Sequence, residues 1–197
     1  MMKSSAQRIV LTGGPCAGKT TLTEVIARVF HEQVAVIPEA ASLLFSGGFP
    51  RWNELDSQKA VQRAIYRVQC ELEAAFSAKY PERILILDRG TVDGAAYWPE
   101  GPERFFSTFN TTLTQELARY DHVLYLESAA QEDYLFHIKK NPNRTENWNE
   151  AKRLDEETRK LWSEHFRMKF VANQRSFDLK VSEVISLIRE ILDGKKV

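Results

Sequence analysis

A glycine-rich segment near the start of the chain constrains its fold more than any other feature. Residues 13–21 read GGPCAGKTT, after the apolar run Ile9-Val10-Leu11 and before apolar residues that recur at helical spacing. Glycines permit backbone angles that other residues avoid, so consecutive N–H groups can turn inward around an anion. The following helix adds its unpaired N–H groups and the positive end of its dipole. The segment therefore predicts a phosphate-binding turn, called the phosphate loop below, between a strand and a helix.

The phosphate loop completes the pattern G-x-x-x-x-G-K-[ST] in the strand-to-helix context that the pattern requires. Lys19 supplies a mobile positive charge for the outer phosphates, and the Thr20 hydroxyl can bind the Mg²⁺ that accompanies a nucleoside triphosphate. The residues expected to surround the nucleotide are Gly13, Gly14, Pro15, Cys16, Ala17, Gly18, Lys19, Thr20 and Thr21. The alternative is a glycine-rich turn that only caps a helix and leaves Lys19 solvated.

Short apolar runs alternate with helical patterns along the rest of the chain. The runs that are too short for helices are Ile9–Leu11, Val34–Ile37, Ile84–Leu87, His122–Leu126 and Met168–Val171. Apolar residues between them recur with a period near 3.6 residues, as amphipathic helices require. The alternation favours an α/β fold with a mainly parallel sheet covered on both faces, because right-handed crossovers place helices there.

Polar residues follow the predicted strands, at the sheet edge where open α/β folds bind their ligands. Asp88 ends an apolar run as in a Walker B element and is expected to bind Mg²⁺ directly or through water. Its alternative role is to cap the next helix. Arg89 offers a planar cationic fork for a phosphate or for the acceptor substrate, or it forms a structural ion pair, with Glu39 as candidate partner.

Glu39 follows the second predicted strand, near the edge where an acceptor hydroxyl would arrive. Phosphoryl transfer depends on alignment and charge neutralisation more than on strong bases, yet one carboxylate that orients and deprotonates the hydroxyl is typical. Glu39 is the candidate for that carboxylate, or else it caps the helix that begins at Ala40. Among the aromatic residues, Tyr97 and Trp98 are candidates for a ring-binding pocket, although aromatics in this number mostly fill cores.

A charged stretch of about residues 131–160 follows the fourth predicted strand. Its composition is typical of a helical lid that closes over a triphosphate, excludes water and delivers arginines, with Arg144 and Arg153 as the expected contributors. The alternative is a solvated helical hairpin with Glu-to-Lys pairs. Asn173, after the last predicted strand, either contacts the nucleotide base or simply ends the strand.

Composition excludes several classes of partner. The 197 residues are the size of a single domain, 1–197, and Lys plus Arg balance Asp plus Glu at 27 each, so no net field attracts nucleic acid. No apolar run approaches the roughly 18 to 20 residues that span a bilayer, and no signal peptide is apparent. Two cysteines are too few for a disulfide framework. We expect a cytoplasmic protein.

Four segments together resemble one known family. LTGGPCAGKTT, VIPEAASLLFSGG, ILDRGTVDGAAYW and NRTENWNEAKRLDEETRKLW occur in this order and span most of the chain. They resemble the NadR and TRPL-translocation-defect family of P-loop proteins, whose domain is known as AAA-type ATP-binding or ribosylnicotinamide-kinase-like. The resemblance implies a kinase-like P-loop NTPase fold with five parallel strands in the order 2-3-1-4-5, ATP or GTP as co-substrate, and Mg²⁺.

The same resemblance implies roles for individual residues and two classes of function. Lys19, Thr20 and Asp88 would take nucleotide and metal roles, with Glu39 as base and Arg89 as clamp on a phosphate or on the acceptor. The first function is ATP-dependent phosphoryl transfer to a small-molecule hydroxyl, with a nucleoside- or riboside-like acceptor. The second is a regulatory ATP- or GTP-binding module that controls association with a protein or a phosphoinositide. Neither the acceptor nor the oligomeric state follows from the sequence.

Overall fold

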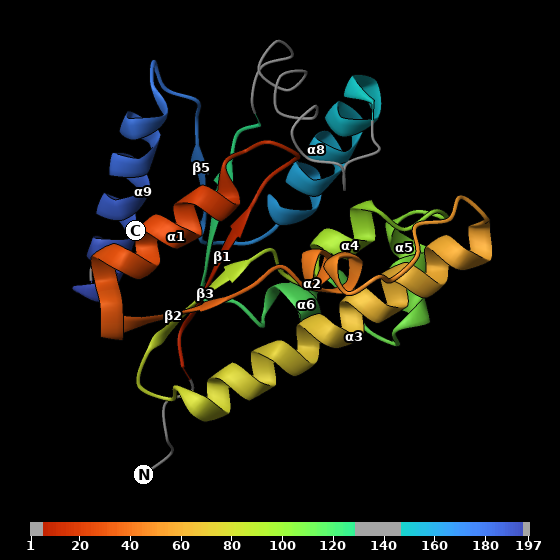
Figure 1. Cartoon of the computed structure of the whole chain (residues 1–197), viewed down its shortest axis with the longest axis horizontal. Helices are drawn as coiled ribbons and strands as arrows, with labels where there is room; N and C mark the ends of the chain where they lie inside the picture. Colours follow the sequence, from red (N-terminus) through yellow and green to blue (C-terminus); the bar gives the residue numbers. More distant parts are fainter. Residues whose placement is uncertain (1–5, 129–146, 195–197) are drawn as a thin grey trace.

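The five short apolar runs are the strands of one sheet. The computed structural model describes residues 6–128 and 147–194. Its strands are β1 (Arg8–Thr12), β2 (Val34–Ile37), β3 (Ile84–Asp88), β4 (His122–Leu126) and β5 (Met168–Val171). All neighbours pair in parallel, in the order β2-β3-β1-β4-β5 (Figure 1). The expected α/β architecture and strand order of a P-loop NTPase fold are confirmed.

Helices connect the strands and cover both faces of the sheet. They are α1 (Lys19–Phe30), α2 (Ala40–Ser46), α3 (Leu55–Lys79), α4 (Asp93–Ala96), α5 (Pro102–Thr108), α6 (Leu113–Leu117), α8 (Trp148–Trp162) and α9 (Phe177–Leu192), with a short 3₁₀ helix at His31–Gln33. Among the described residues, none of these helices combines the length and the apolar character needed to cross a membrane.

The side chains of each strand point alternately to the two faces, and this alternation divides the core into two layers. Ile9 and Leu11 of β1 pack with residues of α1 and α9, whereas Val10 between them packs with residues of α3 and the shorter helices. Figure 1 shows α1 and α9 together on one side of the sheet and α3 on the other. Because both faces are covered, the carboxyl ends of the strands and the loops after them are left to form a site.

The charged stretch predicted as a lid falls partly within the described residues. Residues 131–146, which include Arg144, lie outside them, whereas residues 148–160 form most of α8 and Asn147 is its N-cap. The Asn147 side chain accepts a hydrogen bond from the Glu150 N–H at 3.0 Å and so caps the helix. Leu154, Leu161 and Trp162 are buried, so α8 packs against the body of the protein instead of projecting freely into solvent.

Candidate functional site

The turn between β1 and α1 has the backbone that a phosphate loop requires. Gly13, Cys16 and Gly18 have φ angles of 137°, 60° and 86°. A Cβ atom at Gly13 would collide with the carbonyl oxygen of Leu126, so only glycine fits there. Gly18 is the N-cap of α1, and no side chain caps that helix. The first N–H groups of α1 are therefore left to bind an anion.

Lys19 is folded into the phosphate loop instead of extending into solvent. Its Nζ donates hydrogen bonds to the carbonyl oxygens of Gly13 and Gly14, each at 2.9 Å, and the residue is 7% exposed. Burial, together with the charge of Arg89, lowers the pKa of Lys19 to about 8, although nearby carboxylates oppose the shift. Lys19 is therefore not solvated, as the alternative required, and phosphate binding by the turn remains a prediction.

Asp88, at the end of β3, lies beside Thr20 of the phosphate loop. The Thr20 Oγ1 is 3.4 Å from the Asp88 Oδ2, and within the described residues no hydrogen-bond donor reaches the buried Asp88 Oδ1. Burial, reinforced by the charge of Glu39, raises the pKa of Asp88 to about 6. Helix α4 begins only at Asp93, with Val92 at its N-cap, so Asp88 caps no helix. A hydroxyl beside a carboxylate with an unpartnered oxygen suits Mg²⁺, which prefers oxygen ligands.

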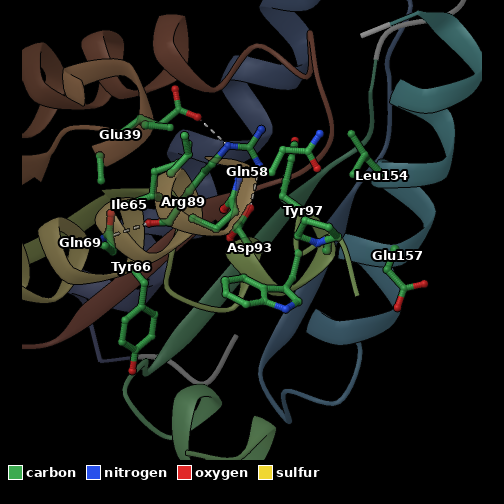
Figure 2. Close-up of a pocket in the computed structure, with 18 of the residues that line it drawn as sticks. Glu39, Gln58, Ile65, Tyr66, Gln69, Arg89, Asp93, Tyr97, Leu154 and Glu157 are labelled. Atoms are coloured by element: carbon green, nitrogen blue, oxygen red, sulfur yellow. Dashed lines mark hydrogen bonds and ion pairs between the residues drawn. The ribbon is translucent and has the colours of Figure 1, made fainter. Parts of the chain in front are cut away.

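Arg89 links two carboxylates across the same edge of the sheet. Its Nε donates to the Glu39 Oε1 and its Nη1 to the Asp93 Oδ1, both at 2.7 Å (Figure 2). Its φ angle of 71° is unusual for a residue other than glycine. The ion pair with Glu39 that the sequence left open is therefore formed. A clamp on substrate phosphate remains a prediction, because Arg89 still has donors to offer.

Glu39 is charged at neutral pH and its side chain caps nothing. Burial alone would raise the pKa of Glu39, but Arg89, the Ser42 hydroxyl and Lys19 together hold the pKa below its ordinary value. Glu39 occupies the N-cap position of α2, yet its side chain makes no capping hydrogen bond to the helix. Its carboxylate instead faces Arg89 at the wall of a cavity.

Asp93 is a site residue that the sequence reasoning missed. Besides Arg89, its buried carboxylate accepts hydrogen bonds from the Thr12 hydroxyl at 2.7 Å, the Gly90 N–H at 3.1 Å and the Trp162 indole N–H at 3.1 Å. It thus joins β1, the turn after β3 and α8. A second acid five residues after Asp88 was the available signal, but its partners come from distant parts of the chain.

A cavity of about 960 Å³ opens beside the phosphate loop, on the side of α2, α3 and α4. This volume is at the upper end of the range of small-molecule sites. Pro15, Glu39, Arg89 and Arg153 contribute to its wall, together with the aromatic residues Phe45, Trp52, Tyr66, Tyr97 and Trp98 and the amides Asn53, Gln58, Gln62 and Gln69. Figure 2 shows Leu154 and Glu157 projecting from α8 on the opposite side of the cavity from Tyr66 and Gln69.

Helix α8 contributes to the site in two ways, only one of which was expected. Arg153 lines the cavity, as its proposed role requires. Asp155 was not foreseen: its Oδ1 accepts a hydrogen bond from the Gly14 N–H at 2.7 Å, and its backbone carbonyl accepts one from the Tyr125 hydroxyl at 2.7 Å. This helix therefore touches both the phosphate loop and the cavity. Nothing in its charged sequence singles out Asp155 from its acidic neighbours.

Asn173 lies beside the phosphate loop, where its side chain bonds to protein groups. Its Nδ2 donates to the Ser128 carbonyl at 2.6 Å, and its Oδ1 accepts from the Nζ of Lys180 at 3.0 Å. These bonds favour the alternative in which Asn173 ends the strand, and contact with the base remains a prediction. Lys180 is a further residue that sequence reasoning missed, although a lysine on the buried face of α9 was a visible signal.

Comparison with known protein families covers most of the site. A family model described as an AAA domain matches residues 8–178, which include the phosphate loop, all five strands and α8. The chain matches no curated protein. A phosphate loop of this kind implies binding of a nucleoside triphosphate, usually with Mg²⁺, and either its hydrolysis or phosphoryl transfer. Because the match covers most of the sequence, the chain belongs to the AAA domain family.

Proposed function

We propose that the protein is a kinase that transfers a phosphoryl group from ATP, with Mg²⁺, to a hydroxyl of a small nucleoside- or riboside-like acceptor. One observation carries the proposal: the cavity of about 960 Å³ meets the phosphate loop at Pro15 and has an ionised carboxylate, Glu39, in its wall. An enzyme that only hydrolyses ATP needs no cavity of this size beside the triphosphate. A kinase needs one for its second substrate.

Glu39 would orient the acceptor hydroxyl. Its lowered pKa makes it a weak base, which suffices because phosphoryl transfer requires little proton abstraction before the transition state. The ion pair with Arg89 fixes the direction of the carboxylate, so an incoming hydroxyl meets an acceptor already in place.

Cationic side chains would neutralise charge on the transferring group. Lys19 already lies in the phosphate loop, and Arg89 and Arg153 line the cavity, Arg153 from α8. Thr20 and Asp88 would hold Mg²⁺, which would supply positive charge to offset the negative charge of the phosphates. Arg144 is proposed as a further contributor and lies outside the described residues.

The cavity lining suggests the class of acceptor. Aromatic faces favour a planar ring, and the amides of Gln58, Gln62 and Gln69 offer both donors and acceptors for its polar edge. Tyr97 also lies under Arg89, with the guanidinium carbon 5.7 Å from the ring centroid. A ring linked to a hydroxyl-bearing sugar would place its ring among these groups and its hydroxyl near Glu39.

The decisive experiment is an assay of phosphorylated product over a panel of nucleosides, ribosides and simple sugars, with ATP or GTP and Mg²⁺. The proposal expects product from at least one ribose-containing acceptor. ATP hydrolysis without product from any acceptor in the panel would contradict it. Omission of Mg²⁺ is the matched control and should abolish both product and hydrolysis.

The alternative is a regulatory module whose nucleotide state controls binding to a protein or a phosphoinositide, as the narrower resemblance to NadR and TRPL-translocation-defect proteins suggests. It is favoured by the hydrogen bond between Gly14 and Asp155, through which a bound nucleotide could alter α8. Nucleotide-dependent partner or lipid binding that survives Glu39→Gln would favour this alternative over the kinase.

A further inference from the structure

A lysine is buried behind the phosphate loop, on the side away from the cavity. Lys180, in the first turn of α9, is 3% exposed. Its Nζ donates to the Ala17 carbonyl at 3.1 Å, the Glu127 carbonyl at 2.7 Å and the Asn173 Oδ1 at 3.0 Å. The three oxygens come from the phosphate loop, the end of β4 and the segment after β5. One ammonium group thus joins three loops that are far apart in sequence.

Burying a charged side chain at position 180 costs free energy, because the charge loses its hydration. Val184 and Ile188 occupy the same buried face of α9, so an apolar residue at 180 would simply continue that face. Lysine is almost never fully buried unless it is paired, because its charge loses hydration. Three acceptors satisfy all three N–H groups of the ammonium. Such complete pairing is typical of a group that sets the arrangement of its partners.

The bond to Ala17 acts directly on the anion-binding backbone. The carbonyl of Ala17 and the N–H of Gly18 belong to one peptide unit, and Gly18 is the N-cap of α1. A charged donor on the carbonyl oxygen fixes the plane of that peptide unit and polarises it, which makes the N–H on its other side a better donor to an anion. The ammonium also places a positive charge behind the loop, in a buried setting where screening is weak.

We propose that Lys180 is a positioning residue for the phosphate loop, which orients and polarises the Ala17–Gly18 peptide unit and so strengthens triphosphate binding without contacting the phosphates. The proposal concerns binding alone. It requires a triphosphate in the loop but no acceptor and no phosphoryl transfer, so it holds or fails independently of the kinase proposal.

The test is calorimetric titration of Lys180→Met and Lys180→Gln with three probes in Mg²⁺ buffer: ATP, inorganic tripolyphosphate and adenosine. The methionine variant should bind ATP and tripolyphosphate about tenfold more weakly, since a hydrogen bond to a charged group is lost. The glutamine variant keeps a neutral donor and should lie between the methionine variant and the unsubstituted protein. Lys169→Met removes an exposed lysine from β5 and should bind all probes normally.

The three probes distinguish positioning of the phosphate loop by Lys180 from a contribution of Lys180 to folding stability alone. Variants with a lower melting temperature but unchanged affinity for tripolyphosphate, measured well below that temperature, would overturn the proposal. It would also fail if only adenosine and ATP bound more weakly, because Lys180 would then act through Asn173 on the base. Should the methionine variant not fold, the glutamine variant decides: normal tripolyphosphate affinity overturns the proposal, and weakened affinity with intact folding supports it.

Discussion

The two halves of the site, the phosphate loop and the cavity beside it, use different chemical groups. On the phosphate side, the groups predicted to recognise the nucleotide are mainly backbone N–H groups of one continuous turn, shaped by Gly13 and Gly18. On the cavity side, they are side chains from α2, α3, α4, the turn after β3 and α8, and the ion pairs of Arg89 join two of them, Glu39 and Asp93. The first half is therefore encoded within nine consecutive residues, 13–21, whereas the second exists only when distant segments meet.

This difference indicates which half of the site selects the acceptor. A backbone cradle recognises any phosphate, because every residue carries the same N–H group. A cavity of side chains can select one acceptor by shape and hydrogen bonding. Substitutions on the phosphate side should consequently weaken nucleotide binding, and substitutions on the cavity side should slow transfer to the acceptor.

The largest expected effect comes from the cavity side. Glu39→Gln keeps the size of the side chain but removes the charge that orients the hydroxyl, so kcat for acceptor phosphorylation should fall about 1000-fold, within the usual range for general-base groups. Affinity for ATP, measured by calorimetry, should stay within about twofold. Glu100→Gln, at a carboxylate that pairs with Lys59 at 2.6 Å, is the control and should leave kcat unchanged. Equal losses in kcat and in ATP affinity would contradict the assignment of nucleotide binding to the phosphate side and of transfer to the cavity side.

A smaller effect is expected on the phosphate side. Lys19→Ala removes the ammonium group that bonds to the Gly13 and Gly14 carbonyls, and ATP affinity should fall about 100-fold, as expected for a hydrogen bond between charged groups. Lys152→Ala on α8 removes an exposed lysine and serves as the matched control. Calorimetry in Mg²⁺ buffer measures both variants. Normal ATP affinity after Lys19→Ala would mean that the turn does not hold the phosphates.

The smallest effect concerns pH and the metal. With its pKa near 6, the Asp88 carboxyl is largely protonated at pH 5 and ionised at pH 7 in the metal-free protein. Mg²⁺ must displace that proton, so the contribution of Asp88 to Mg²⁺-dependent nucleotide binding should weaken about tenfold between pH 7 and pH 5. Asp88→Asn removes this titration, and comparing the pH profiles of the two proteins isolates it from protonation of the nucleotide. Parallel profiles would show that Asp88 is not a metal ligand.

Local patterns predicted the strands and the phosphate loop well, because both depend on residues close in sequence. The run Ile84–Leu87 could be recognised as a strand from its apolar residues alone, and Asp88 could be placed at its end. Glu39 and Arg89 were predicted at the same edge because each follows a strand of a parallel sheet, and in the structure β2 and β3 are parallel neighbours. The functions assigned to these residues remain proposals.

Long-range contacts could not be predicted in the same way. Asp93 bonds to Trp162, Asp155 bonds to Gly14, and Lys180 reaches Ala17 across 163 residues of sequence. The residues next to each of these polar groups in the sequence do not reveal its partner. Their partners are set by how α4, α8 and α9 pack on the sheet, which no short window of sequence contains.

The sequence by itself determined that a strand, a glycine-rich turn and a helix form a backbone cradle of the kind that binds anions, because backbone angles and helix ends depend on neighbouring residues. Only the tertiary structure decided that Arg89 holds Glu39 and Asp93 together, that a cavity opens beside the cradle, and that a buried lysine stands behind it. The physical reason is range: conformational preference acts between adjacent residues, whereas side-chain ion pairs and cavities depend on the packing of segments that meet only in the folded protein.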